Sequence, residues 1–276
     1  MKIACNYYKE TEKLVRTGEI DIDYFKFPAI VPQMNIMEND VGFEKFTSGI
    51  TGIKPVLLHG LYPAPHDLAS PDFINNFDEA KVNRLIKLTK TPGISLHPSL
   101  NKIDPAVTEK RLINIIIDNI NFLQEKYADM DFISIENVDT LKFGALIKPE
   151  VISEIVNQSR CGFILDISHA YCAAKHTGED FKKYLSGLPL DKIYEVHING
   201  WFEKGSDIMC HIKINETGYK ILKELLDYCS PKIITVEYGR HNDRLGSGCP
   251  VISLDNINAD IEKEIIEQVS KIKEII

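Results

Sequence analysis

Six short apolar stretches of the chain each end on a residue type that binds metal ions. They are VLLH ending at His59, ISLH at His97, FISIE at Glu136, FILD at Asp166, YEVH at His197 and ITVE at Glu237. Each stretch has the length and apolar composition of a buried strand. Acidic residues are disfavoured within strands and costly to bury without partners, so three carboxylates and three imidazoles at six strand ends indicate a shared site.

Strands and helices alternate along the chain. Two further strand candidates, at 3–6 and 23–27, bring the predicted strands to eight. Amphipathic helices are predicted at 8–17, 38–48, 72–90, 105–127, 148–159, 178–186, 216–229 and 256–275. Strands of consecutive apolar residues are typical of a parallel sheet that is covered by helices. Eight such units with right-handed crossovers predict an α/β fold, a single (β/α)8 TIM barrel that forms one domain over residues 1–276.

Two of the predicted helices carry start signals. Pro105, preceded by Asp104 as a candidate cap, predicts the start of the helix at 105–127, and Pro149 lies in the first turn of the helix at 148–159. The residues predicted to face the sheet are Leu112, Ile115, Ile116, Ile120 and Leu123 in the first helix and Val151, Ile152 and Ile155 in the second.

A doubly wound open sheet is the alternative fold, but it would gather ligands at one switch point rather than at six strand ends. In a barrel, the C-terminal ends of all strands point to one face, so the six side chains should converge on one pocket. Imidazole and carboxylate suit zinc, manganese and non-haem iron, and the chain has no thiolate cluster of the iron–sulfur or structural-zinc type. So many ligands exceed the need of one ion, which predicts a catalytic cluster bridged by a shared carboxylate.

Two more histidines extend the set of candidate ligands. His169 follows Asp166 in a D-x-x-H step, where a helix is predicted to begin and to turn the histidine back toward the pocket. A purely structural alternative makes Asp166 a helix cap and His169 a first-turn residue. His211 follows fourteen residues after His197, in a long loop that can return to the pocket. The remaining histidines, His66, His176 and His241, lack a strand-end position and are left out of the ligand set, with His176 and His241 as candidate pocket residues.

Two loops, at 60–71 and 198–214, are long enough to build a substrate site, and both are rich in turn residues and aromatics. Trp201, the only tryptophan, is either a packed loop anchor or a wall of the substrate pocket. Asn137 directly follows a strand-end glutamate and is a second candidate pocket residue. Cys210 is a third, because a reactive thiolate needs a cationic neighbour and a histidine follows it.

Composition and the absence of certain motifs limit the classes of partner and cofactor that are expected. The net charge of −8 argues against nucleic acid, whose binding depends on Lys and Arg. The six cysteines include no C-x-x-C pair, so most are expected to be reduced core thiols. No signal sequence and no apolar run of roughly 20 residues is found, so a cytoplasmic protein without membrane contact is expected. Without a P-loop or G-x-G-x-x-G, no nucleotide cofactor is expected.

The ligand order His, His, Glu, D-x-x-H, His, His, Glu resembles that of the xylose-isomerase-like barrel superfamily, which includes endonuclease IV and sugar epimerases. Within it, ISIENV at 133–138, LDISHAYCAAKHTGEDFKKYLSGLP at 165–189 and IYEVHINGW at 193–201 look like blocks of the multinuclear non-haem iron-dependent oxidases. The resemblance covers most of residues 50–240. It implies an oxidase that uses iron and O2 to modify a cysteine-containing or similar residue of a ribosomally made peptide, often with a partner protein that presents the peptide.

The resemblance also implies which residues hold each ion. One metal would take His59, His97 and Glu136, and a second would take Glu136, Asp166, His197 and Glu237. A third would take His169 and His211, but the family usually has an Asp two residues before the latter histidine, where this chain has Met209. Asp207 stands two residues further away and is a candidate substitute. Two or three ions are therefore expected, iron first and zinc or manganese as alternatives, with Glu136, Asp166 and Glu237 as the catalytic carboxylates.

Three other functions fit part of this pattern. A hydrolase like endonuclease IV would use the cluster on a phosphodiester, which the acidic charge balance disfavours. A sugar isomerase or epimerase would use the Glu136, Asp166, His197 and Glu237 set around one ion and would leave His59 and His97 unexplained. A non-enzymatic metal-binding protein is disfavoured, because open pockets with many ligands usually mark catalytic sites. The substrate is expected to be a peptide or a small molecule.

Overall fold

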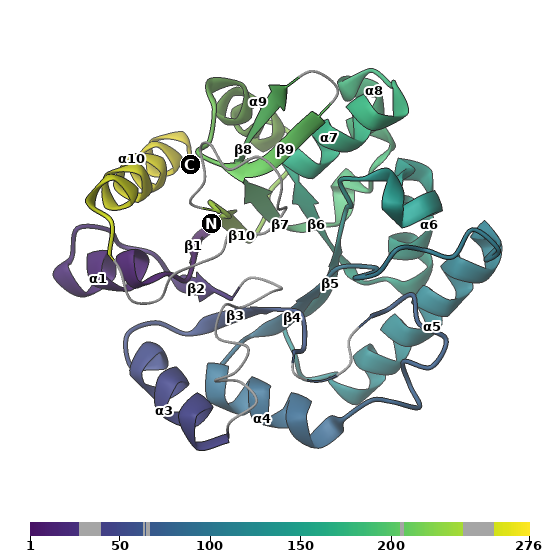
Figure 1. The fold of residues 1–276 in the computed structure, drawn as a ribbon, viewed down its shortest axis with the longest axis horizontal. Helices are drawn as coiled ribbons and strands as arrows, with labels where there is room; N and C mark the ends of the chain where they lie inside the picture. Colours follow the sequence, from purple (N-terminus) through teal and green to yellow (C-terminus); the bar gives the residue numbers. More distant parts are fainter. Residues whose placement is uncertain (28–39, 63, 65–66, 205–206, 240–256) are drawn as a thin grey trace.

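The computed structural model of the protein describes residues 1–27, 40–62, 64, 67–204, 207–239 and 257–276. Its centre is a closed barrel of eight parallel strands in the order β1–β10–β7–β6–β5–β4–β3–β2 (Figure 1). The strands are β1 (Lys2–Asn6), β2 (Tyr24–Lys26), β3 (Val56–His59), β4 (Gly93–Leu96), β5 (Phe132–Glu136), β6 (Gly162–Asp166), β7 (Ile193–Ile198) and β10 (Ile233–Val236). The predicted (β/α)8 barrel is confirmed, and all eight predicted strands are present.

A ring of helices covers the outside of the barrel (Figure 1). The α-helices are α1 (Lys9–Thr17), α3 (Asp40–Thr51), α4 (Glu79–Thr89), α5 (Glu109–Lys126), α6 (Pro149–Ser159), α7 (Ile167–Thr177), α8 (Phe181–Gly187), α9 (Glu216–Leu226) and α10 (Ala259–Ile275), with short 3-10 helices η1 (Leu141–Ile147) and η2 (Leu190–Lys192). Among the described helices, none is long and apolar enough to cross a membrane. One domain over the whole chain stays a prediction.

Helix α5 starts later than its proline suggested. Asp104 caps a short turn instead, with its side chain accepting a hydrogen bond from the Ala106 N–H at 2.9 Å. The helix begins at Glu109, where the Thr108 hydroxyl accepts the Arg111 N–H and satisfies a free helix donor. The core face is close to the predicted one, because Leu112, Ile116, Ile120 and Leu123 are buried, whereas Ile115 is only half-buried. Pro149 does begin α6, and Val151, Ile152 and Ile155 are buried.

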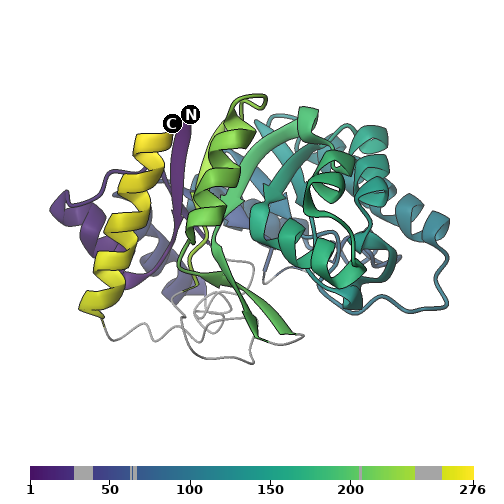
Figure 2. The same cartoon turned by 90° about the horizontal axis from the view of Figure 1, so that it is seen from above.

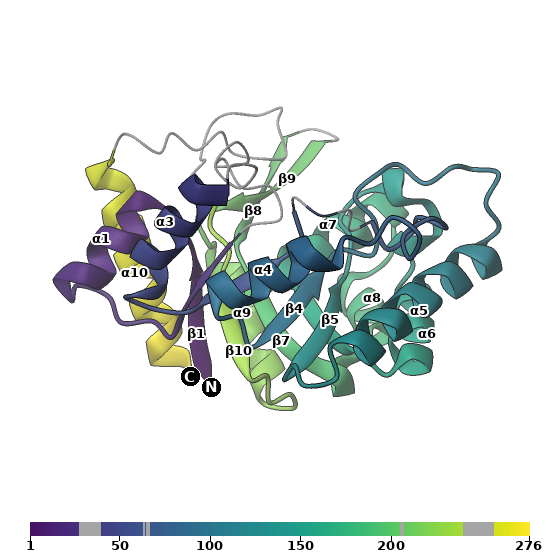
Figure 3. The ribbon, with the colours of Figure 1, turned by 90° about the horizontal axis from the view of Figure 1, so that it is seen from below.

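Three other segments differ from their predictions. Helix α4 begins at Glu79 rather than at 72, because residues before it form turns. Helix α7 was not among the eight predicted helices and follows β6 directly, before α8. The predicted loop at 198–214 contains an antiparallel hairpin, β8 (Gly200–Lys204) and β9 (Asp207–Ile212). This hairpin lies at the end of the barrel opposite to the chain termini (Figures 2 and 3).

The parallel register aligns the C-terminal ends of neighbouring strands. Asp166 of β6 pairs with His197 of β7, and His59 of β3 pairs with Ser95, two residues before His97. Strands β3, β4 and β5 are buried along their whole length. The six strand-end residues therefore reach one end of the barrel from buried backbone, as the sequence predicted.

The orientation of α5 on the barrel can be tested by shortening the side chains of two adjacent isoleucines to alanine. Ile116→Ala should lower the free energy of unfolding by about 2–5 kcal/mol, because Ile116 is fully buried. Ile115→Ala makes the same chemical change at a half-buried position of the same helix and should cost less. Urea denaturation of both variants measures the difference. Equal losses would contradict the orientation of α5.

Candidate metal centre

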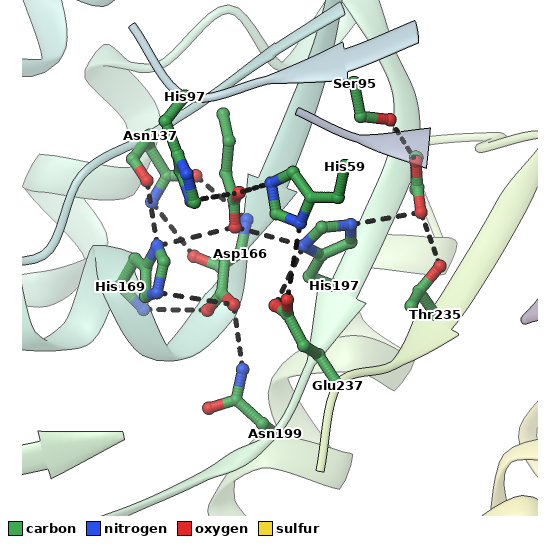
Figure 4. A network of polar contacts seen from close by, with 12 residues as sticks. His59, Ser95, His97, Asn137, Asp166, His169, His197, Asn199, Thr235 and Glu237 are labelled. Atoms are coloured by element: carbon green, nitrogen blue, oxygen red, sulfur yellow. Dashed lines mark hydrogen bonds and ion pairs between the residues drawn. The ribbon is translucent and has the colours of Figure 1, made fainter. Parts of the chain in front are cut away.

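Eight side chains from eight different parts of the barrel face gather at the C-terminal ends of the strands. Figure 4 labels His59, His97, Asp166, His169, His197 and Glu237 among them. His59, Glu136, Asp166 and His197 lie on barrel strands, His97 and Glu237 directly follow theirs, His169 lies in the first turn of α7 and His211 lies on β9. All eight predicted ligands are therefore brought together. Six of them are buried, and only His97 and His211 are partly exposed. The site is closed below and opens on the side of these two histidines.

Glu136 is the carboxylate at the centre of the group. Its Oε2 lies 2.9 Å from Nε2 of His59 and 3.0 Å from Nε2 of His97. Its Oε1 faces the other way and lies 3.0 Å from Nδ1 of His197 and 3.4 Å from Nδ1 of His169. The two oxygens of one carboxylate thus serve two different sets of nitrogens, which is the arrangement expected of a bridging ligand.

Glu237 closes the pocket from the opposite side. Its Oε2 lies 3.0 Å from Nδ1 of His197 and 3.7 Å from Nε2 of His211. Its Oε1 lies 3.6 Å from Nδ1 of His59. Four groups of residues could each hold a metal ion, because within each group one ligand atom per residue lies within 4.8 Å of the others. The groups are His59, His97 and Glu136; Glu136, Asp166, His197 and Glu237; His59, His197 and Glu237; and His169, Cys210 and His211.

Several of these buried atoms lack a hydrogen-bond partner among the described residues. They are both ring nitrogens of His59, Oε2 of Glu136, Nε2 of His169 and Oε2 of Glu237. Short distances such as the 2.9 Å between His59 and Glu136 therefore do not have the direction of a hydrogen bond. Leaving a buried polar atom unpaired costs about 1–3 kcal/mol, and more when it is charged. Cations placed among these atoms would remove that cost, so the residues present fit metal ions.

The surroundings set the charge of each group. Burial opposes the charge of Glu136, but the imidazoles of His197 and His59 outweigh burial and hold the pKa of Glu136 well below its usual value. At Asp166 burial dominates and raises the pKa to about 6, against the attraction of His169. Burial likewise lowers the pKa of His97 to about 3. An ionised Glu136 and a neutral His97 are the forms that bind a metal cation, whereas Asp166 raises the pKa of His169, and Glu237 that of His197, against the effect of burial.

A buried ion pair supports His197 from below. The Nε2 of His197 lies 3.0 Å from Oε1 of Glu195, and Glu195 accepts hydrogen bonds from the Lys26 ammonium at 2.8 and 2.9 Å. Ser95 and Thr235 donate hydroxyl hydrogen bonds to the same carboxylate. A carboxylate behind a histidine fixes its ring orientation and makes the facing nitrogen a better metal ligand.

Sequence analysis overlooked this support, although a signal was present. Lys26 and Glu195 are charged residues inside two otherwise apolar strands, and both side chains are completely buried. Charges are rarely buried unless they are paired, so two opposite charges in separate barrel strands point to each other.

Asp166 has two functions at once. Its Oδ1 caps α7 by accepting the His169 N–H at 2.8 Å, and its Oδ2 accepts the Asn199 amide at 2.8 Å. Ser168 donates its hydroxyl to Oδ1 as well. The helix-cap and pocket interpretations therefore both hold, because one short side chain at a strand end serves the cap and also lies among the pocket carboxylates.

The candidate pocket residues have different surroundings. Asn137 is fully buried, and its amide bonds both the N–H and the C=O of Asp166, so it positions a ligand rather than lining an opening. Trp201 is buried and stacks on Tyr171 with ring centroids 4.5 Å apart, which favours the loop-anchor interpretation. Cys210 lies beside His211, with its Sγ 3.1 Å from Nδ1.

The remaining candidate residues either lie away from the pocket or are not among the residues that the structure describes. His176 is in the last turn of α7, roughly 10 Å along the helix from His169 at 1.5 Å per residue. His66 and His241 lie outside the described residues. The side chains of Asp207 and Met209 also lie outside the described part of the chain.

Comparison with solved structures identifies the fold class. D-psicose 3-epimerase from Clostridium cellulolyticum has a TM-score of 0.64 and 11% identity, over 100% of this chain and 99% of that chain. Endonuclease IV from Thermus thermophilus has a TM-score of 0.56 and 15% identity, over 99% of this chain and 100% of that one. The fold is the xylose-isomerase-like TIM barrel that the sequence predicted. Together with the gathered side chains, it defines a TIM barrel with a candidate metal centre at the C-terminal ends of its strands.

The sequence places the chain more narrowly. The profile of the family described as "RiPP precursor modification enzyme MbnB/TglH/ChrH" matches residues 9–244, and the chain belongs to this family. A UPF0276 protein of Acaryochloris marina is 24% identical over 178 residues, 60% of this chain and 61% of that protein. The chain spans less than two thirds of the length of the first curated relatives that it matches. The resemblance seen in the sequence is confirmed at the level of the family.

Removing the charge of Glu195 should weaken both the fold and the metal site. Glu195→Gln leaves Lys26 buried without a counter-charge, and breaking a buried ion pair in this way costs about 3–5 kcal/mol of unfolding free energy. Metal affinity should fall about 10–100-fold, because His197 loses its charged support. Denaturation and metal titration measure the two effects.

The double variant Lys26→Met with Glu195→Gln separates these effects. It leaves no unpaired charge, so it should recover stability relative to Glu195→Gln, while metal affinity stays low. Wild-type metal affinity in the double variant would show that Glu195 does not act through His197.

Glu136→Gln should strip most of the bound metal, because the charge it removes is shared between two groups of ligands. His97→Gln is the matched control, since His97 belongs to one of these groups only and its loss should release one ion. Elemental analysis of both purified variants gives the metal content per chain. Full metal content in Glu136→Gln would rule out a bridged cluster.

Proposed function

We propose that the protein is a multinuclear, iron-dependent oxidase that modifies a peptide substrate with dioxygen as the electron acceptor. The observation that carries this proposal is Glu136, whose two oxygens face two separate sets of nitrogens. A centre with two ions fits that arrangement better than a centre with one. Membership of a family described as enzymes that modify RiPP precursors supports a peptide as the substrate.

Two sets of residues would hold the paired ions. His59, His97 and Glu136 would hold one, and Glu136, Asp166, His197 and Glu237 would hold the other. Imidazole with carboxylate is a ligand set of non-haem iron, with zinc or manganese as alternatives. Bound iron would supply the capacity to pass electrons from the substrate to dioxygen.

The residues of the chain itself fix the metal ligands in position and leave one side of the site open to the peptide. Glu195 and Asn137 fix the ligands from behind, so the ligand atoms are in position before substrate arrives. The partly exposed edges of His97 and His211 mark the side from which a peptide can approach. On that side Asp139 is half-buried beside Cys210, and burial raises the pKa of its carboxyl group.

The cellular setting follows from the same chemistry. We place the protein in the cytoplasm, where thiols stay reduced, and the cysteines that the structure describes are all free. The peptide would be brought by a partner protein that presents it, as the sequence resemblance implies. Nucleic acid is not proposed as a ligand, since the chain has 40 acidic and 32 basic residues.

A single-metal sugar isomerase or epimerase is the second candidate. The group of Glu136, Asp166, His197 and Glu237 is fully buried and would suffice for one ion. This candidate leaves the two ring nitrogens of His59 without a partner among the described residues. The two-ion oxidase gives the Nε2 of His59, which lies 2.9 Å from Oε2 of Glu136, a metal ion to bind, and for this reason we prefer it.

The oxidase can be tested on protein purified without oxygen and loaded with Fe(II). Air and a cysteine-containing peptide encoded by a neighbouring gene are then added. O2 should be consumed, and the mass of the peptide should fall by the loss of hydrogen or rise by the gain of oxygen. Glu237→Gln should abolish this activity, whereas Glu203→Gln, at an exposed glutamate on β8, should leave it unchanged. Mass spectrometry and an oxygen electrode give the result. Activity on a free sugar with one Mn(II) per chain, and no O2 uptake, would favour the epimerase instead.

A further inference from the structure

The third group of ligand types, His169, Cys210 and His211, lies beside the paired site and is not used by it. The Sγ of Cys210 is 3.1 Å from Nδ1 of His211, and the rings of His169 and His211 have centroids 5.2 Å apart at 75°. One ligand atom from each residue lies within 4.8 Å of the others. The residues come from α7 and β9, so the fold rather than sequence proximity brings them together.

His169 presents a nitrogen that has no other partner. Its Nδ1 lies 2.9 Å from the backbone oxygen of Asn137, which makes Nδ1 the protonated donor. The lone pair is then on Nε2, which is buried and lacks a hydrogen-bond partner among the described residues. The side chain is only 7% exposed. A histidine held in this way, with one nitrogen bonded to a carbonyl and the other free, has the form of a metal ligand.

Cys210 and His211 reach the same side because the strand is distorted. Successive residues of a regular strand point to opposite faces. Here His211 has φ +64, in the left-handed region, and the pairing of β9 with β8 shifts register, so that three steps on β9 oppose two on β8. A bulge of this kind re-aims side chains near active sites.

The strained backbone of His211 is held on both sides. Its N–H donates to Oδ1 of Asn199 at 2.7 Å, and its C=O accepts the Gly239 N–H at 2.7 Å. Such a conformation is strained for a residue other than glycine and persists only where the surroundings enforce it. Asn199 also donates to Asp166, so the distortion is tied to the paired site.

The resemblance already implies a third metal on His169 and His211, and we propose that in this chain Cys210 completes that site with a thiolate. The proposal rests on the proposed function for the paired ions beside it. The carboxylate expected two residues before His211 is replaced by Met209, and the bulge brings the thiol of Cys210 forward instead. Asp139 lies on the same side, with its Oδ2 3.9 Å from Sγ of Cys210. A thiolate in place of a carboxylate makes this position the softest of the three and favours Zn(II) or Fe(II) there.

Cobalt(II) is a suitable probe, because a cobalt–thiolate bond gives a charge-transfer absorption in the near ultraviolet that imidazole and carboxylate ligands do not give. The metal-free, reduced full-length chain should bind three Co(II) and develop this band. Cys210→Ser should lose the band and bind two Co(II). Cys172→Ser is the matched control, since this buried thiol interacts with Cys210 but belongs to none of the ligand groups, and it should keep both the band and three ions.

Cys210→Asp guards against a variant that fails to fold. It restores a carboxylate and should bind three Co(II) without the band. Binding of two Co(II) by the wild type without a band, or persistence of the band in Cys210→Ser, would overturn the third site. A single Co(II) whose band is lost in Cys210→Ser would support the thiolate site and overturn the paired centre instead.

Discussion

The buried carboxylate of Glu136 is the interaction on which the rest of the site depends. It is completely inaccessible to solvent, yet imidazoles approach both of its oxygens to about 3 Å. An ionised carboxylate is held in a protein interior only when charges of opposite sign surround it. Asp166 and Glu237 add two more acids to the same pocket, so the acidic groups need cations as well as histidines. Metal ions between the ligand groups would meet that need and would account for atoms such as Nε2 of His59 and Oε2 of Glu136, which face each other without a hydrogen bond.

The same requirement shapes the barrel below the pocket. A TIM barrel is usually filled by apolar layers, but here Lys26 and Glu195 form a buried pair in the interior. This pair contacts the candidate metal site through the His197 ring, which lies between Glu195 and Glu136. Charge would therefore be neutralised in two places, by a lysine in the interior and by metal ions at the C-terminal ends of the strands. The Lys26–Glu195 pair takes the place of apolar packing in the barrel interior and holds the His197 ring in a fixed orientation. Both residues of the pair lie on strands, which position a site more rigidly than loops do.

Sequence alone predicted the barrel and the convergence of the six strand-end side chains, because both depend on periodic, local signals. Apolar strands that end on His, Asp or Glu converge in any closed parallel barrel, so His59 and Glu237 can be placed together without coordinates. The rest depends on contacts that are distant in sequence. Lys26 and Glu195 are 169 positions apart in the sequence, and the function of either residue can be inferred only once their contact is known. Helix α7 is built of small residues with little periodicity, so only its start near His169 was predicted, and the β8–β9 hairpin lacks clean alternation and was not predicted at all. The bulge at His211 arises from one backbone angle, which no residue pattern reports.

The central claim is that one carboxylate joins two ions in this pocket. Crystals of protein purified and grown without oxygen, measured on both sides of the iron absorption edge, test it most directly. Anomalous difference maps should have two iron peaks on opposite sides of the Glu136 carboxylate, one bounded by His59 and His97 and the other by Asp166, His197 and Glu237. A single peak bound by the second group, with His59 and His97 free of metal, would contradict the account.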